Sequence, residues 1–184
     1  YSEDLANETY LGLTDADYAN NPYRRYVGSN EDYIETEHKQ IMLTHLIKPF
    51  ENFSITTKAY KNEFARNWYK LDAVKVGASK VSINNILTNP ATYNAEYGAI
   101  TGADNTINNA LLVKANNRSY EAKGIQTVAN YTFETGKTKH DIDFGIRYHE
   151  DFEDRFQWVD GYAIQNGVMN RTSNGTPGTD ANAI

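Results

Sequence analysis

Hydrophobic and polar residues alternate with a period of two along several stretches of the chain. The clearest stretch is 140–158, where Ile142, Phe144 and Ile146 share one parity and Asp141 and Asp143 share the other. Successive side chains of a β-strand point to opposite faces of a sheet, so this stretch predicts a strand at about 139–158 with one apolar and one charged face. A helix would mix the two sets of residues on every face.

The stretch just before it, 118–133, alternates in the same way, and a short polar segment containing Gly136 separates the two. A strand, a short turn and a second strand form the pattern of a β-hairpin. A second hairpin is predicted upstream, with strands at 34–48 and at about 53–71. Pro49 marks its turn, because proline cannot donate a hydrogen bond to a ladder.

The return strand of this upstream hairpin is less regular than the others. Tyr60, Phe64 and Trp68 share one parity, but the alternation weakens near Thr56. A β-bulge or a change of face remains open at that point.

Long connections rich in Asn separate the predicted strands, at 15–33, 72–117 and 159–184, and a further strand is expected at about 5–14. All three connections fall on the same side of the hairpins. Loops of this length count against a compact soluble domain. Tight turns at one end and long loops at the other are typical of transmembrane β-barrels, whose strands are apolar outside and polar inside.

Composition narrows the range of functions. The 184 residues carry a net charge of −6, which argues against a nucleic-acid partner, and they include no cysteine. Thiolate metal sites and disulfide scaffolds are therefore excluded. The longest apolar run, 41–47, is far shorter than the ~20 residues of a membrane helix, whereas ~9–11 alternating residues suffice for a membrane strand.

Two segments resemble the barrel of TonB-dependent outer-membrane receptors, with the closest likeness to the ferric-citrate type. The first segment includes 7–14 and Asn21-Pro22-Tyr23-Arg24-Arg25-Tyr26, and the second is 59–71, similar to the Tyr-x-Asn-x-Phe-x-Arg-x-Trp strand of the family. The resemblance implies an all-β fold of antiparallel up-and-down strands, forming part of a 22-stranded transmembrane barrel with long extracellular loops. It covers a partial barrel segment, and we expect no plug domain and no TonB box within 1–184.

The resemblance also implies a function. The chain would be part of a receptor in the bacterial outer membrane that binds a ferric chelate (ferric citrate or a siderophore) and imports it. Its expected partners are the chelate, the TonB energy transducer, and outer-membrane lipid and lipopolysaccharide. We expect no enzymatic activity and no cofactor, because iron would arrive already chelated.

Four residues are candidates for ligand binding. Arg24 and Arg25 lie in the first long loop, and guanidinium groups match the carboxylates of citrate or a siderophore; the alternative is a solvated pair or one that faces lipopolysaccharide. Arg147 and His149 lie on the charged parity of 139–158, where they either touch a ligand or form an ionic network with neighbouring strands or a plug. The four histidines are scattered without metal-ligand spacing, so no metal site is expected.

Five aromatic residues are predicted to lie at the membrane interfaces, where amphipathic rings are favoured. Phe53 and Phe133 would lie near the tight turns, and Trp68, Tyr148 and Phe152 near the long loops.

Two other classes of protein remain open. One is a secreted, soluble β-rich module that binds carbohydrate, in which a second sheet would cover Ile142, Phe144 and Ile146. The other is a complete small outer-membrane barrel with a structural role, which would need two more strands within 72–117. The only candidates there are 83–87 and 107–113.

Overall fold

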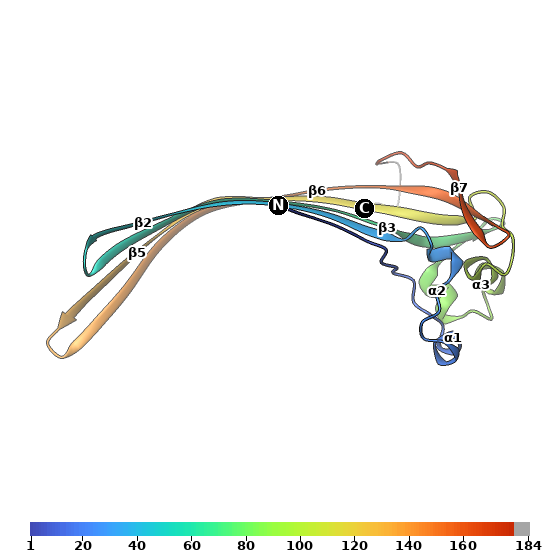
Figure 1. Cartoon of the computed structure of the whole chain (residues 1–184), viewed down its shortest axis with the longest axis horizontal. Coiled ribbons are helices and arrows are strands. Elements are labelled where there is room, and N and C mark those ends of the chain that lie inside the picture. The colour runs from blue at the N-terminus through green and yellow to red at the C-terminus, as the bar shows by residue number, and fades with distance from the viewer. Residues whose placement is uncertain (179–184) are drawn as a thin grey trace. The chain divides into compact units, whose positions relative to one another are not determined.

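The computed structural model describes residues 1–178. The expectation of antiparallel β-structure is confirmed in its general form, since the chain is mostly antiparallel sheet with 62% of the structure in strands. One sheet joins the strands in the order β1-β2-β3-β5-β6-β7, and β4 pairs with β3. Figure 1 labels β2, β3, β5, β6 and β7 of this sheet. The strands are β1 (Ser2–Ala6), β2 (Tyr33–Phe50), β3 (Phe53–Val76), β4 (Ser79–Ser82), β5 (Leu111–Thr135), β6 (Thr138–Gln165) and β7 (Val168–Ser173).

The expected connections contain regular structure that the sequence analysis did not predict. They hold the helices α1 (Asp15–Asn20), α2 (Ile83–Thr88) and α3 (Asn94–Thr101) and the 3-10 helix η1 (Val27–Ser29). Residues 83–87, one candidate for an extra strand, therefore lie in a helix. Thr14 and Ser82 cap α1 and α2 by accepting backbone N–H bonds, which the alternation of hydrophobic residues does not reveal.

Several strand boundaries also differ from the expected ones. The strand expected at 5–14 is instead the short β1, and residues 7–14 are not in a strand. β3, β5 and β6 extend into the expected loops at 72–117 and 159–184, and β7 lies within the second of these. The end of that loop, 179–184, lies outside the described residues. Pro49 lies inside β2, and the turn follows at Glu51 and Asn52.

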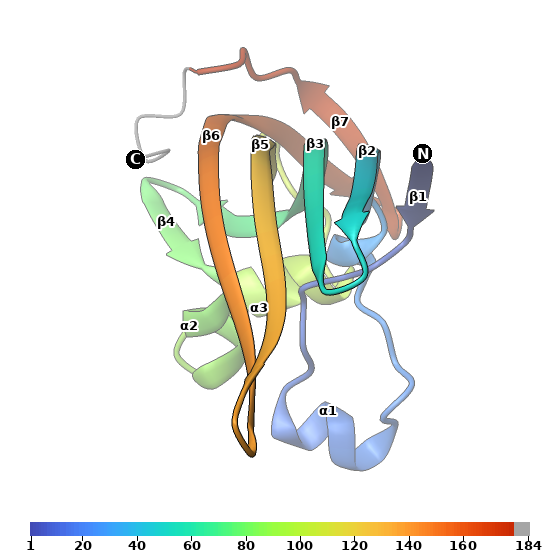
Figure 2. The same cartoon turned by 90° about the vertical axis from the view of Figure 1, so that its left-hand side faces the viewer.

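The chain divides into two compact units, which we describe separately. The first, the sheet unit, comprises Tyr1–Glu3, Glu37–Ala65 and Ser119–Asp154. It holds the β2–β3 and β5–β6 hairpins, which lie side by side in Figure 2. Gly136 has a positive φ of 64° in the tight turn between β5 and β6, a conformation that glycine adopts without strain. The described residues of this unit include no buried side chain.

The second, the core unit, comprises Asp4–Thr36, Arg66–Arg118 and Arg155–Ile184. Its hydrophobic core is built by residues from the parts of the strands that belong to this unit and from α2 and α3, and Val27 of η1 packs against it. The core includes Tyr26, Leu71, Val74, Ile86, Ile100, Leu111, Val113, Tyr162 and Ile164. Gly28 of η1 packs against α3, where an added Cβ would lie 3.3 Å from the backbone of Ile100. A hydrophobic core of this kind is the ordinary basis of stability in water.

Candidate functional site

An apolar face runs across the four long strands of the sheet unit. Ring contacts help to define it: the ring of Phe53 contacts Tyr131, and the ring of Phe133 stacks with those of Tyr131 and His140. The face comprises Ile41, Leu43 and Ile47 of β2, Phe53 of β3, Ile125, Tyr131 and Phe133 of β5, and Ile142, Phe144, Ile146 and Tyr148 of β6.

No second layer of the described chain covers this face. Phe144 is 73% exposed and Ile146 is 70% exposed, and Ile142 is also exposed. Contiguous exposed apolar patches of this kind mark surfaces that meet a membrane or a partner. From Ile125 to Phe133, β5 rises about 26 Å, or about 20 Å if tilted by ~40°, which is slightly less than the ~25 Å apolar band of a transmembrane barrel.

The opposite, polar face carries a chain of hydrogen bonds centred on Tyr60. The Arg147 Nε–H donates to the Tyr60 hydroxyl over 3.2 Å, and that hydroxyl lies 2.6 Å from Nδ1 of His149. Nε2 of His149 lies 2.8 Å from Asp151. When the His149 imidazole is neutral, the Tyr60 hydroxyl donates to its Nδ1, and its Nε2–H donates to the Asp151 carboxylate. Every group in this series of hydrogen bonds then has a partner.

Tyr60 reaches this position because Gly124 of β5 has no side chain. A Cβ on Gly124 would lie 2.8 Å from the Tyr60 hydroxyl and 2.5 Å from the carbonyl oxygen of Tyr148. The glycine therefore leaves space for the tyrosine ring against the sheet. Nearer the turn, the Asn130 side-chain amide donates to Asp141 and Asp143, which continues the polar face.

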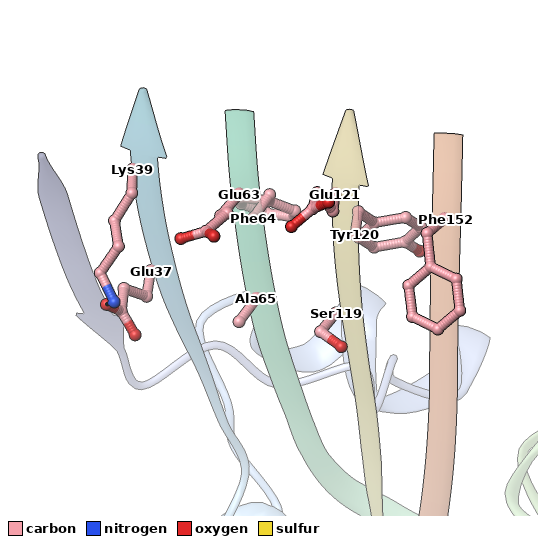
Figure 3. Close-up of a pocket in the computed structure, with 9 residues that line it drawn as sticks. All are labelled: Glu37, Lys39, Glu63, Phe64, Ala65, Ser119, Tyr120, Glu121 and Phe152. Carbon is pink, nitrogen blue, oxygen red and sulfur yellow. Dashed lines mark ion pairs between the residues drawn. The ribbon is translucent and has the colours of Figure 1, made fainter. Parts of the chain in front are cut away.

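A band of alternating charges borders the apolar face on the side away from the tight turns. We call it the charged row: Glu37, Lys39, Lys61, Glu63, Glu121, Lys123 and Glu150. Figure 3 shows part of it, with side chains from β2, β3 and β5 around a shallow hollow that Phe152 of β6 also lines. Ion pairs cross the strands, such as Lys61 with Glu121 at 3.1 Å and Lys123 with Glu150 at 3.4 Å.

The predicted ligand residues fall into two pairs. Arg147 and His149 are brought together by Tyr60 in the sheet unit, whereas Arg24 and Arg25 lie in the core unit. Arg24 forms an ion pair with Asp17 at 2.5 Å, and its guanidinium lies over the ring of Tyr26. Their role in binding stays a prediction, and the structure adds that Arg24 is held within its own loop.

Asp17 organises that loop. Its carboxylate accepts hydrogen bonds from the hydroxyls of Thr14, Tyr26 and Tyr97. Burial alone would raise the pKa of Asp17, but these hydroxyl donors hold its pKa below the ordinary value, with Arg24 assisting. Burial and the bond to Asp17 raise the pKa of Tyr26 to about 12, so its hydroxyl stays a donor.

The predicted interface aromatics are distributed over both units. Phe53, Phe133 and Tyr148 belong to the apolar face, and Phe152 lines the hollow that residues of the charged row surround. Trp68 lies in the core unit, where it makes an edge contact with Tyr10 and where the Lys70 ammonium lies 4.4 Å from its ring. Burial lowers the pKa of Lys70.

A buried polar network in the core unit was not foreseen. The Tyr69 hydroxyl donates to Asp160 over 2.5 Å and lies 3.0 Å from the Tyr162 hydroxyl, to which Arg171 Nε–H donates. The second Asp160 oxygen accepts the N–H of Gly175. Burial and then Asp160 raise the pKa of Tyr69. These residues are far apart in sequence. The only sequence signal for the network was that Asp160 and Tyr162 lie two positions apart on β6 and so share one face of the strand.

Asp32 is a second buried carboxylate of this unit. It accepts the N–H of Leu71 over 2.8 Å and the hydroxyl of Thr9 over 2.9 Å, which ties the segment after β1 to β3. Burial raises its pKa to about 6, although both hydrogen bonds act in the opposite direction.

No group of three or more His, Cys, Asp or Glu side chains suited to a metal ion occurs in the described part of the chain. None of the helices among residues 1–178 combines the length and apolarity needed to cross a membrane. Neither a protein-family model nor a curated protein matches the chain.

Proposed function

We propose that the chain is a segment of a TonB-dependent receptor of the bacterial outer membrane, which imports a ferric chelate. The observation that carries this proposal is the apolar face of the sheet unit, which is exposed on β2, β5 and β6 and is backed by a polar face on β3, β5 and β6. A strand that is apolar on one side and polar on the other suits a barrel wall between lipid and an aqueous interior.

Within such a receptor the two units would have different tasks. The sheet unit would supply barrel wall, with hydrocarbon against the apolar face and a plug or water against the polar face. The core unit would supply extracellular loops that enclose the chelate. Transport would depend on the TonB transducer, and the role is one of binding and transport, with no catalytic step.

The alternatives suit the observations less well. A soluble carbohydrate-binding sandwich would cover Phe144 and Ile146 with a second sheet, and the described residues place no layer there. For a complete small barrel, the described sheet would need its edge strands to pair, but its order begins at β1 and ends at β7.

Cysteine labelling tests the orientation of the wall, because the chain has no cysteine of its own. Ile146→Cys and Asp143→Cys, on opposite faces of β6, would be exposed to a water-soluble maleimide in membranes of cells that make the protein. We expect Asp143→Cys to react and Ile146→Cys to react only after detergent is added. Equal reaction of both in intact membranes would reject the membrane-wall assignment.

Titration with ferric citrate tests the ligand. We expect Arg24→Ala and Arg25→Ala in the intact receptor to weaken binding, because each removes a guanidinium that can pair with a carboxylate. Lys137→Ala in the tight turn is the matched control, since it also removes a cation. Unchanged affinity in both arginine variants would remove these residues from the site.

A further inference from the structure

The core unit contains a small hollow, which we call the α3 hollow, between α3, the end of β3 and the segment that leads into β5. Its volume is about 260 Å³, below the ~300–1,000 Å³ of pockets that hold drug-sized ligands, so it suits a smaller molecule. Ala95 and Ala99 of α3 line it together with Val76 and Ile107. Ile107 is 70% exposed and Val76 is 39% exposed, so both offer apolar surface to a molecule that enters the hollow.

Hydrogen bonds hold the walls of the α3 hollow in place. The N–H of Thr106 donates to the carbonyl of Ile164 over 2.8 Å, and the Thr106 hydroxyl accepts the N–H of Ile164, also over 2.8 Å. The N–H of Lys75 donates to the carbonyl of Ala110 over 2.7 Å, which fixes the end of β3 against the segment before β5. The hollow is therefore formed before a ligand arrives, and binding does not have to order a loop.

One cationic and one anionic side chain line the α3 hollow, and these are Lys75 and Asp104. Within residues 1–178 neither side chain forms a hydrogen bond or an ion pair, with the other or with a third group. Lys80 of β4 lies directly opposite Lys75 in the β3–β4 pairing. Like charges at opposite positions of two strands repel each other, so this end of the hollow favours an anion.

The Asp104 carboxylate lies against α3 at Gly98. A Cβ on Gly98 would collide with this carboxylate, so a glycine, which is disfavoured inside a helix, leaves the space for it. The N–H of Asp104 donates to the carbonyl of Gly98 over 3.4 Å, which places the residue at the C-terminal end of the helix. That end of a helix carries partial negative charge, so it adds to the attraction of the carboxylate for a cation.

We infer that the α3 hollow binds a free apolar α-amino acid, with its ammonium at Asp104, its carboxylate at Lys75 and its side chain against the apolar lining. Both contacts are charge-assisted, and a compact zwitterion supplies both charges from one carbon atom. A simple anion would meet Asp104, a simple cation would meet Lys75, and a hydrocarbon would leave both without a partner. Every residue of the hollow belongs to the core unit, so the inference adds a ligand to the proposed transport role without depending on it.

Equilibrium dialysis of the purified full chain with radiolabelled L-leucine tests the inference. The variants are Lys75→Met, Asp104→Asn and Ala95→Phe, the last of which fills the hollow from an exposed position of α3. We expect each variant to weaken binding about tenfold, because it removes a charge-assisted contact or the space for the ligand. Lys137→Met and Asp4→Asn remove the same charges outside the hollow and should change the affinity less than about twofold. Near-ultraviolet circular dichroism verifies that each variant is folded.

Analogues of leucine test the same contacts on the wild-type chain, so the result does not depend on the folding of a variant. N-acetyl-leucine lacks the ammonium, leucine amide lacks the carboxylate and glycine lacks the side chain. Each should compete with L-leucine about tenfold more weakly than unlabelled L-leucine does. Absence of leucine binding, equal competition by any of the three analogues, or tighter binding of a leucine tripeptide would overturn the inference. The maleimide experiment on β6 is independent, so either result can fail alone.

Discussion

The two units place the same kinds of side chain in opposite surroundings. In the core unit, aliphatic and aromatic residues of β3, β5 and β6 are buried with those of the helices, whereas in the sheet unit β5 and β6 expose theirs and β3 leaves its own only partly buried. The strands are continuous between the units, so secondary structure does not cause the difference. The alternation along a strand therefore specifies which residues share one face of the sheet. Whether an apolar residue on that face stabilises the fold depends on what lies against the face, which is either another layer of protein or the surrounding medium.

The largest effect is expected when one aliphatic side chain in each unit is shortened to alanine and the two losses of stability are compared. Leu111→Ala removes a fully buried side chain and should lower the free energy of unfolding by about 2–5 kcal/mol, because a cavity remains. Ile146→Ala should cost about 1 kcal/mol in lipid, since acyl chains fill the space that the side chain leaves. Denaturant unfolding in vesicles would measure both, and an equally large loss at Ile146 would mean that protein covers it.

A charged residue introduced into the apolar face would show whether lipid or water surrounds that face. Ile146→Lys should destabilise the protein by about 2–4 kcal/mol in vesicles if the residue lies near the bilayer midplane. Gln126→Lys, on the polar face of β5, is the control and should change stability by less than about 0.5 kcal/mol. If Ile146→Lys left the stability in vesicles unchanged, this result would contradict contact between residue 146 and hydrocarbon.

Asp32 gives the core unit a pH dependence of known sign. Its pKa of about 6 in the folded chain exceeds the ordinary 3.8, chiefly through burial, so the folded state binds the proton more tightly. The stabilisation is complete below pH ~4 and is lost as the pH rises through ~6, by about 2–3 kcal/mol. Unfolding free energies of wild type and Asp32→Asn from pH 4 to 7 isolate this contribution, and parallel curves would contradict it.

The sequence predicted the long strands because alternation is a local property. Ile142, Phe144 and Ile146 show it without reference to any other residue, and the turn at Gly136 follows from its own conformation. The helices within 72–117 were missed because they are short and their stability comes from packing against η1, against β4 and against each other. Thr14 and Ser82 are of the residue types that cap helix N-termini, so the sequence did contain local signals for α1 and α2. A search for alternating hydrophobic residues does not detect such signals.

The site was predictable only in part for the same physical reason. Arg147 and His149 stood on the charged parity of β6, but their partner Tyr60 lies on another strand and was grouped with aromatic residues of its own strand. Its orientation depends on the missing side chain of Gly124. The register that brings Lys61 beside Glu121 is likewise a property of strand pairing, which one sequence does not specify.

The smallest expected effect tests how the polar face of the sheet unit is held together. Tyr60→Phe keeps the ring over Gly124 but removes the hydroxyl that joins Arg147 to His149. We expect a loss of about 0.5–1 kcal/mol, because water can replace the hydroxyl at an exposed face. Tyr131→Phe on the apolar face is the matched control and should cost less, since no hydrogen bond of its hydroxyl is lost. A loss at Tyr60 above about 2 kcal/mol would mean that the donors of Arg147 and His149 become buried without partners, and hence that another part of the protein covers this face. Denaturant unfolding of both variants under one set of conditions would distinguish a wet interior face from a covered one.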